Sequence, residues 1–185
     1  MPSTCRSRCA RPQVKANPLA ATEREEKMFH KTLIGATGEY YVAALLSAMG
    51  VIVALPRGGV PSTDLLVTSE NGKIALALQI KTGRRPYQKN IKQQRPYLMW
   101  DCSLKAIDNI SNEKWYAFVS LNSWPVEEST PKVYFIPSKV VSERMKQQKK
   151  DKRKRPFYWV FEDEAQKYEG HAGLKLVIKE LTKKD

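Results

Sequence analysis

The stretch that decides the fold is residues 63–82, which read TDLLVTSENGKIALALQIKT. Two β-prone apolar runs flank an Asn-Gly pair at 71–72, the strongest short-range signal of a β-hairpin. A two-residue type I′ loop there sets Asp64 opposite Gln79, at a Cβ separation of about 5 Å. Lys81 follows two residues later on the same face of the strand. This register brings an acid, an amide and an amine together.

The two faces of this hairpin differ in character. The apolar face is predicted to pack on the core and consists of Leu65, Val67, Leu76 and Leu78. The other face carries the polar residues together with Ala75 and Ala77, whose small side chains leave room for a helix to pack closely. The alternative is that Gln79 and Lys81 are merely polar residues at a fraying strand end.

The composition favours a single basic domain that binds a polyanion. The chain has 185 residues, of which 42% are hydrophobic, and this suits one domain with a sizeable core. Its 32 Lys and Arg outnumber its 19 Asp and Glu, and the net charge of +13 exceeds what solubility requires. Nucleic acid is the first partner that such a charge indicates, and an anionic membrane surface is the second.

Other sequence features bear on the compartment. No apolar run approaches the roughly 18 residues that a membrane-spanning helix needs, and no secretory signal follows the N-terminus. The three cysteines, Cys5, Cys9 and Cys102, form no Cys-x-x-Cys pair and indicate a reducing compartment without structural zinc. We therefore expect a cytoplasmic, intracellular protein that is not secreted and has no membrane association.

The N-terminal residues differ from the rest of the chain. Residues 1–22 are basic, contain no acid and are interrupted by prolines. We interpret them as a flexible basic arm, with an organelle-targeting peptide as the alternative. Residues 23–185 are predicted to form a single domain.

Helical spacing precedes the hairpin. The pattern over 23–49 predicts a helix that is interrupted or restarts at 35–38, with Thr37 as a possible cap. Gly50 is predicted to end it, and a short buried strand follows at 51–56. The remaining predicted elements are a short helix or loop at 101–114, strands at 115–121 and 132–136, a helix from Ser138 through Met145, a strand or buried segment at 157–161, and a strand or helix at 173–181.

Two further features are candidates for function. Glu39 is predicted on or beside the helix face that packs on the sheet, where a carboxylate needs a partner or a cation; the alternative is that it favours the helix N-terminus through the dipole. A run of cations and aromatic residues follows the hairpin, namely Arg84, Arg85, Tyr87, Lys89, Lys92, Arg95, Tyr97 and Trp100. Such a run suits phosphates and unstacked bases, or is a solvated loop.

This order of elements resembles the PD-(D/E)XK nuclease superfamily, and within it the archaeal Holliday-junction resolvases and the Mrr-type restriction endonucleases. The Gly-Glu pair ending at Glu39 resembles the helix-borne glutamate of that family. Ser62-Thr63-Asp64 resembles its PD element, with threonine in place of proline, and Gln79-Ile80-Lys81 resembles its (D/E)XK element in the QXK form. The resemblance implies an α/β restriction endonuclease-like fold with an αβββαβ core, in which helices flank a central mixed sheet.

The resemblance also implies a chemistry, namely metal-dependent hydrolysis of DNA phosphodiester bonds by an endonuclease. Mg²⁺ is the expected ion, with Mn²⁺ as a substitute. Asp64 would be the central ligand, joined by the side-chain oxygen of Gln79, the carbonyl of Ile80 and the carboxylate of Glu39. Lys81 would orient or deprotonate the attacking water or stabilise the phosphate, and we favour the electrostatic role.

The expected partner is DNA, and a homodimer is possible by analogy. The residues expected to hold the DNA backbone are Arg57, Arg84, Arg85, Lys89 and Lys92. Because Gln79 removes one negative charge from the metal site, a non-catalytic nucleic-acid-binding module on the same fold is the alternative function. A basic α/β interaction protein, in which the polar triad is a coincidence, is the third.

Overall fold

The computed structural model describes residues 31–57, 60–89, 95–125, 127–148 and 156–183. The basic arm predicted at 1–22 therefore lies outside the described residues. The first eight residues of the domain predicted at 23–185 lie outside them as well.

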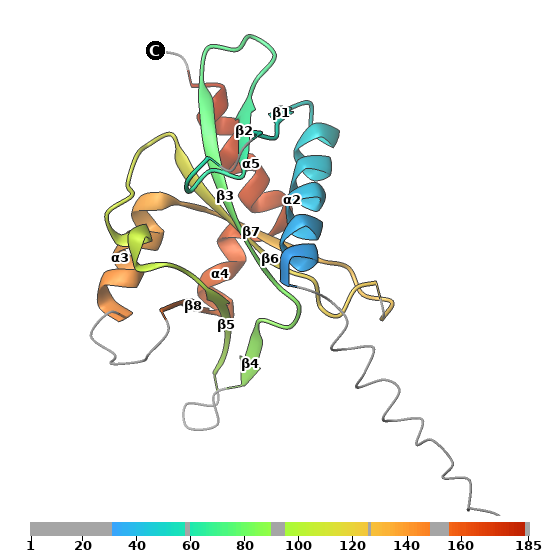
Figure 1. The fold of residues 1–185 in the computed structure, drawn as a ribbon, viewed down its shortest axis with the longest axis vertical. Helices are drawn as coiled ribbons and strands as arrows, with labels where there is room; N and C mark the ends of the chain where they lie inside the picture. The colour runs from blue at the N-terminus through green and yellow to red at the C-terminus, as the bar shows by residue number, and fades with distance from the viewer. Residues whose placement is uncertain (1–30, 58–59, 90–94, 126, 149–155, 184–185) are drawn as a thin grey trace, which may run out of the picture. The chain divides into compact units, whose positions relative to one another are not determined.

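A five-stranded mixed sheet forms the centre of the fold (Figure 1). In spatial order its strands are β1 (Ile52–Ala54), β2 (Leu65–Thr68), β3 (Ala75–Gly83), β6 (Lys114–Ser120) and β7 (Lys132–Pro137). β3 and β6 are parallel, whereas the other neighbours pair antiparallel. The predicted α/β class with a central mixed sheet is therefore confirmed.

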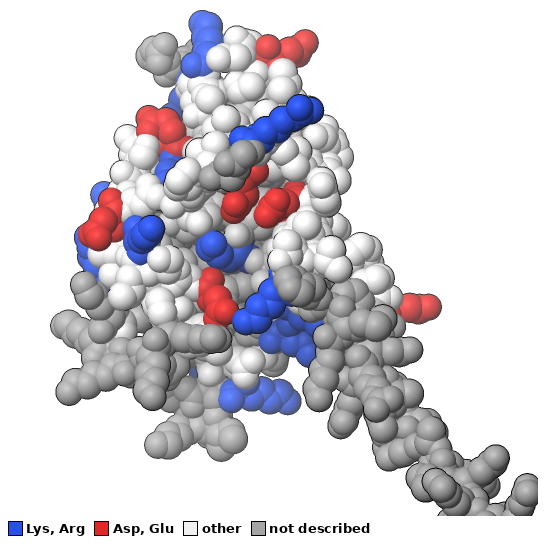
Figure 2. Space-filling view, viewed as in Figure 1, with Lys and Arg blue, Asp and Glu red and all other residues white. Residues whose placement is uncertain are grey.

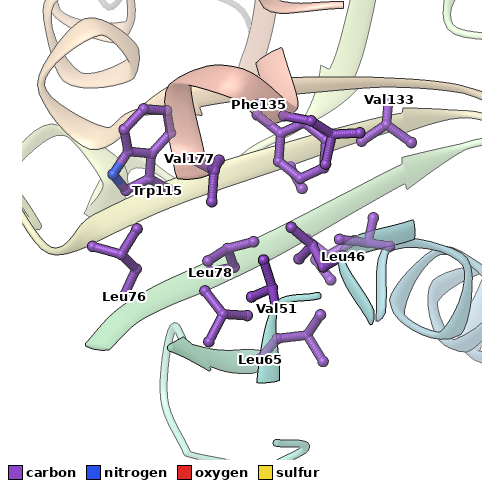
Figure 3. Close-up of a cluster of buried hydrophobic side chains, with 14 of the residues drawn as sticks. Leu46, Val51, Leu65, Leu76, Leu78, Trp115, Val133, Phe135 and Val177 are labelled. Carbon is purple, nitrogen blue, oxygen red and sulfur yellow. The ribbon is translucent and has the colours of Figure 1, made fainter. Parts of the chain in front are cut away.

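Two helices, α2 (Lys31–Ala48) and α5 (Gly170–Leu181), cover one face of this sheet. Their side chains form one core cluster with the apolar face of the hairpin, and its labelled members in Figure 3 are Leu46, Val51, Leu65, Leu76, Leu78, Trp115, Val133, Phe135 and Val177. The prediction that the leucine and valine face packs on the core is confirmed. The prediction that a helix lies over Ala75 and Ala77 is wrong, because the helices bury the larger apolar side chains of the opposite face and Ala75 is exposed.

A second layer packs on the other face of β6 and β7. It contains a small antiparallel sheet of β4 (Tyr87–Lys89), β5 (Pro96–Asp101) and β8 (Phe157–Phe161). The helices α3 (Ser138–Gln148), η1 (Leu104–Ile107), α4 (Glu162–Ala165) and η2 (Gln166–Tyr168) complete the described elements. Stacking joins the two sheets, since the rings of Phe118 in β6 and Tyr158 in β8 have centroids 4.4 Å apart.

The connection between β3 and its parallel neighbour β6 differs from the usual αβββαβ core. Within its described residues it contains the strands β4 and β5 and the 3-10 helix η1, where the usual core has an α-helix. Four members of the run of cations and aromatic residues thus lie on strands of the second sheet, namely Tyr87, Lys89, Tyr97 and Trp100. For these four the alternative of a solvated loop is wrong, whereas Arg84 and Arg85 precede β4.

The hairpin has the predicted register but a different turn. Leu65 lies opposite Leu78, as predicted. The strands separate over residues 69–74, and the amide of Gly72 closes a turn by donating to the carbonyl of Ser69 at 2.9 Å. Gly72 has a φ of 66°, but the asparagine before it lacks a positive φ. The type I′ loop needs positive φ at both residues, so that prediction is wrong.

Helix α2 is continuous through the predicted interruption at 35–38, so that interruption is wrong. Thr37 lies inside the helix, where its hydroxyl donates to the carbonyl of Leu33 at 2.8 Å and caps no terminus. The helix ends where predicted. Gly50 has a φ of 79° and its amide bonds to Ser47, while the next amide bonds to Leu46, and these two bonds form a Schellman motif.

The other predicted elements are mostly present. The strand predicted at 51–56 is β1, but it is an edge strand and its Ile52 is 52% exposed, so the prediction that it is buried is wrong. The structure confirms, to within one residue, the strands predicted at 115–121, 132–136 and 157–161. The helix predicted from Ser138 begins at that residue. Of the two ambiguous segments, 101–114 contains the short helix η1 and 173–181 is helical. Among the described residues, no helix is long and apolar enough to cross a membrane.

The two faces of β2 give a test of this packing. Leu65 is fully buried and its neighbour Leu66 is 43% exposed. We expect Leu65→Ala to lower the free energy of unfolding by about 2–5 kcal/mol, because it leaves a cavity. Leu66→Ala should change it by about 0.5 kcal/mol or less. Urea denaturation followed by circular dichroism measures both, and equal losses would contradict the assigned faces.

Candidate functional site

Asp64 lies just before β2, where the pairing of β2 and β3 ends with Leu65 and Leu78. Its amide donates to the Leu78 carbonyl at 2.8 Å, and its carboxylate Oδ2 accepts from the amide of Ile80 at 2.6 Å. These bonds hold Asp64 across from Gln79, although the two residues do not form a regular ladder pair. The backbone of β3 therefore orients the carboxylate.

Gln79 and Lys81 lie on one face of β3 and are both half-buried. Because β3 pairs in parallel with β6, they lie beside Tyr116 and Phe118 respectively, two buried aromatic residues. Aromatic rings of β6 therefore lie along one side of the face that carries Gln79 and Lys81. The predicted grouping of Asp64, Gln79 and Lys81 at one end of the hairpin is present.

Glu39 reaches this group because helix α2 packs unusually closely on β3. Gly38 is buried, and a Cβ at this position would overlap the hydroxyl of Thr82. The pKa of Glu39 is raised by burial and by the charge of Asp64, while Lys81 opposes that shift. Figure 2 shows acidic and basic side chains gathered over the region where α2 meets β3. A carboxylate in this setting favours a cation beside it.

Lys114 also belongs to this group, although the sequence did not indicate it. It opens β6, is only 7% exposed, and its Nζ donates to the carbonyl of Ser62 at 2.7 Å. Burial lowers the pKa of its amine, the charge of Asp64 opposes this shift, and the charge of Lys81 adds to it. The sequence contains no signal that places Lys114 near the site, because its position depends on how β6 pairs with β3, a strand far from it in the sequence.

A hollow of about 340 Å³ lies next to Lys81. It is lined by Lys81, Asp101, Cys102, Ser103 and Pro156. Burial raises the pKa of the Cys102 thiol to about 11, against the opposing charge of Lys81. The thiol is therefore protonated at neutral pH.

The atoms of the candidate site that could bind a metal ion are all oxygens. Among the described residues, no group of three or more His, Cys, Asp or Glu side chains is arranged to hold a metal ion. The predicted ligands would offer the carboxylate oxygens of Glu39 and Asp64, the side-chain carbonyl oxygen of Gln79 and the backbone carbonyl oxygen of Ile80. Hard oxygen donors of this kind fit Mg²⁺ or Mn²⁺, but with only two carboxylates the set carries little negative charge.

The residues predicted to contact DNA have different surroundings. Three of them lie wholly or partly at the surface, namely Arg57, Arg84 and Lys89. Arg85 is exposed but forms an ion pair with Glu127 at 2.9 Å. Lys92 lies outside the described residues.

Part of the run of cations and aromatic residues serves the fold. The guanidinium of Arg95 bonds to Asp163 at 2.5 Å and lies 3.9 Å from the ring centroid of Phe161. Trp100 is buried, and its Nε1 donates to the carbonyl of Val119 at 2.9 Å. These two residues are therefore held by the protein itself.

Comparison with known proteins identifies the fold. The bacterial homing endonuclease I-Ssp6803I is similar in structure, with a TM-score of 0.51 at 16% sequence identity over 82% of this chain and 94% of that one. Hjc, a Holliday junction resolvase from the archaeal hyperthermophile Archaeoglobus fulgidus, gives a TM-score of 0.40 at 14% identity over 71% of this chain and 87% of that one. No family model and no curated protein matches this sequence. The chain therefore has the fold of this homing endonuclease, and the restriction endonuclease-like α/β fold that was predicted is confirmed.

The close approach of α2 can be tested with a matched pair of glycines. Gly38→Ala should lower the free energy of unfolding by about 1–3 kcal/mol, because the added methyl group forces Thr82 or the helix to move. Gly35→Ala is the control, since nothing lies within 4 Å of a Cβ there, and it should raise the stability by about 0.5–1 kcal/mol. Chemical denaturation compares them. A Gly38→Ala protein as stable as the parent contradicts the close approach.

Proposed function

We propose that this chain is a metal-dependent endonuclease that hydrolyses DNA phosphodiester bonds. The observation that carries the proposal is the grouping of Glu39, Asp64, Gln79 and Lys81 where α2 meets β3. The net charge of +13 supports a polyanionic substrate. The similar solved structure of a homing endonuclease supports DNA as that substrate.

The oxygens of Asp64, Glu39, Gln79 and Ile80 would hold Mg²⁺ or Mn²⁺. Such an ion, when bound, neutralises charge on the phosphate and lowers the pKa of a water molecule. The amide of Ile80 keeps the Asp64 carboxylate turned in one direction through a 2.6 Å hydrogen bond. This fixed orientation avoids the cost of ordering the ligand when the substrate binds.

Lys81 would act on the phosphate itself. It lies on the same face of β3 as Gln79, and its charge influences the pKa of Glu39. A phosphate bound at this group would therefore lie in the field of its ammonium charge. There it would stabilise the additional negative charge of the pentavalent transition state. The exposed Arg57 and Lys89, together with the half-buried Arg84, would bind flanking phosphates, so affinity should fall with salt.

A second candidate function is a non-catalytic nucleic-acid-binding module on the same fold. The observation that favours it is Gln79, an uncharged residue at the position where the family pattern has Asp or Glu. Two carboxylates attract Mg²⁺ less strongly than three do. Cleavage assays separate the two functions.

Cleavage of supercoiled plasmid at low salt tests the proposal directly. We expect nicking with Mg²⁺ or Mn²⁺ and none with EDTA. Asp64→Asn and Lys81→Ala should each slow cleavage by about 10²–10³-fold, because Asp64 would hold the metal ion and Lys81 would stabilise the negative charge of the transition state. Lys73→Ala, which changes an exposed lysine of the hairpin turn, is the control and should cleave normally.

The outcomes have distinct meanings. If Lys81→Ala cleaves as fast as the parent, the assignment of the site is wrong. If the parent shifts DNA in a gel at low salt but does not cleave it with either ion, the binding module is correct.

The role of Gln79 gives a separate prediction. Gln79→Glu adds a carboxylate to the site and should lower the Mg²⁺ concentration for half-maximal cleavage by roughly tenfold, since affinity follows the charge of the ligands. Gln88→Glu adds the same charge on β4 and is the control. A Mg²⁺ titration of the cleavage rate measures the effect. An unchanged titration for Gln79→Glu would exclude Gln79 as a ligand.

A further inference from the structure

Lys114 is buried beside the candidate site but belongs to neither the hairpin nor helix α2. As the first residue of β6 it pairs with Ala77 of β3, and it is only 7% exposed. A lysine is seldom buried to this extent unless its ammonium group has a partner. Its Nζ donates to the carbonyl of Ser62 at 2.7 Å.

The partner of Lys114 is a residue with a strained backbone. Ser62 has a φ of 63°, which is unfavourable for a residue that carries a Cβ. The next amide, that of Thr63, donates to the carbonyl of Val60 at 3.3 Å, so Ser62 lies in a tight turn. Asp64 follows two residues later, and the shape of this turn therefore sets the direction in which the chain enters β2.

Lys114 also lies within electrostatic reach of the site. The charges of Asp64 and Lys81 both influence the pKa of its amine. Glu39 reaches the same group from α2, whereas Lys114 reaches it from β6. The ammonium group of Lys114 thus contacts the turn at Ser62, and its pKa is influenced by the carboxylate of Asp64 that follows this turn.

We propose that Lys114 is a positioning residue of the candidate site. By binding the carbonyl of Ser62 it holds this residue in the left-handed turn, and it thereby fixes the Asp64 carboxylate against the amide of Ile80. Lys114 acts through Asp64 and does not touch the substrate. Its effect on catalysis depends on the proposed nuclease function, but its effect on the orientation of Asp64 does not.

The amide of Ile80 provides a readout that needs no activity, because it donates to Asp64 Oδ2 at 2.6 Å. Lys114→Met removes the ammonium group and keeps a side chain of similar shape. We expect it to shift the ¹H–¹⁵N NMR signal of Ile80 and to speed its amide hydrogen exchange, as Asp64→Asn does. Lys73→Met, in the exposed hairpin turn, is the control and should leave the signal in place. An unchanged Ile80 signal in folded Lys114→Met overturns the proposal.

Ser62→Gly separates a positioning role from a general loss of packing. Glycine adopts a φ of about 60° without strain, so the turn no longer needs the ammonium group. We expect Ser62→Gly to return the Ile80 signal of Lys114→Met toward that of the parent. If Lys114→Met does not fold alone, it should fold in the Ser62→Gly background. Failure of both the rescue and the folding overturns the proposal.

Cleavage kinetics link this role to the proposed function. Lys114→Met should lower kcat by about 10- to 100-fold and leave KM for DNA within about twofold, as expected for a residue that orients a ligand. Ser62→Gly should restore kcat. If the parent does not cleave but Lys114→Met shifts the Ile80 signal, the nuclease function fails and the positioning role stands. If the parent cleaves and the Ile80 signal of Lys114→Met is unchanged, only the positioning role fails.

Discussion

The hydrogen bond from the Ile80 amide to the Asp64 carboxylate ties the candidate site to the sheet. Because this amide belongs to the strand that also carries Gln79 and Lys81, the acid cannot move independently of them. Bonds between a backbone amide and a charged acceptor are among the stronger ones in proteins. The orientation of Asp64 is therefore fixed by the backbone of β3, although Asp64 itself lies one residue before β2.

Because side chains alternate along β3, the residues that stabilise the core and the residues of the candidate site lie on opposite faces of this strand. Leu76, Leu78 and Ile80 point into the core formed with α2 and α5, while Gln79 and Lys81 occupy the other face. Helix α2 contributes to stability and to the site. Its buried residues pack in the core, and Gly38 lets the helix approach β3 closely enough to bring Glu39 to the site. A change that moves this helix should alter stability and the site together.

The sequence predicted the central part of the fold because side chains alternate with a period of two. The Asn-Gly pair and this alternation determined the register of Leu65 with Leu78, and the same count placed Asp64 beside Gln79. The turn type was not predictable, because a wider turn over 69–74 preserves the register. The second sheet and Lys114 were missed, since both depend on pairings between strands far apart in the sequence.

The edges of the five-stranded sheet have a consequence for how copies of the chain meet. An edge strand with free peptide groups can recruit a strand from another molecule, which is how many β-rich proteins begin to aggregate. Here β1 has only three residues, and β7 ends at Pro137 and carries a bridge from Tyr134 to Glu169. The β1 edge thus offers little backbone to a foreign strand, and the bridge to Glu169 occupies part of the β7 edge, so both features work against sheet extension between copies.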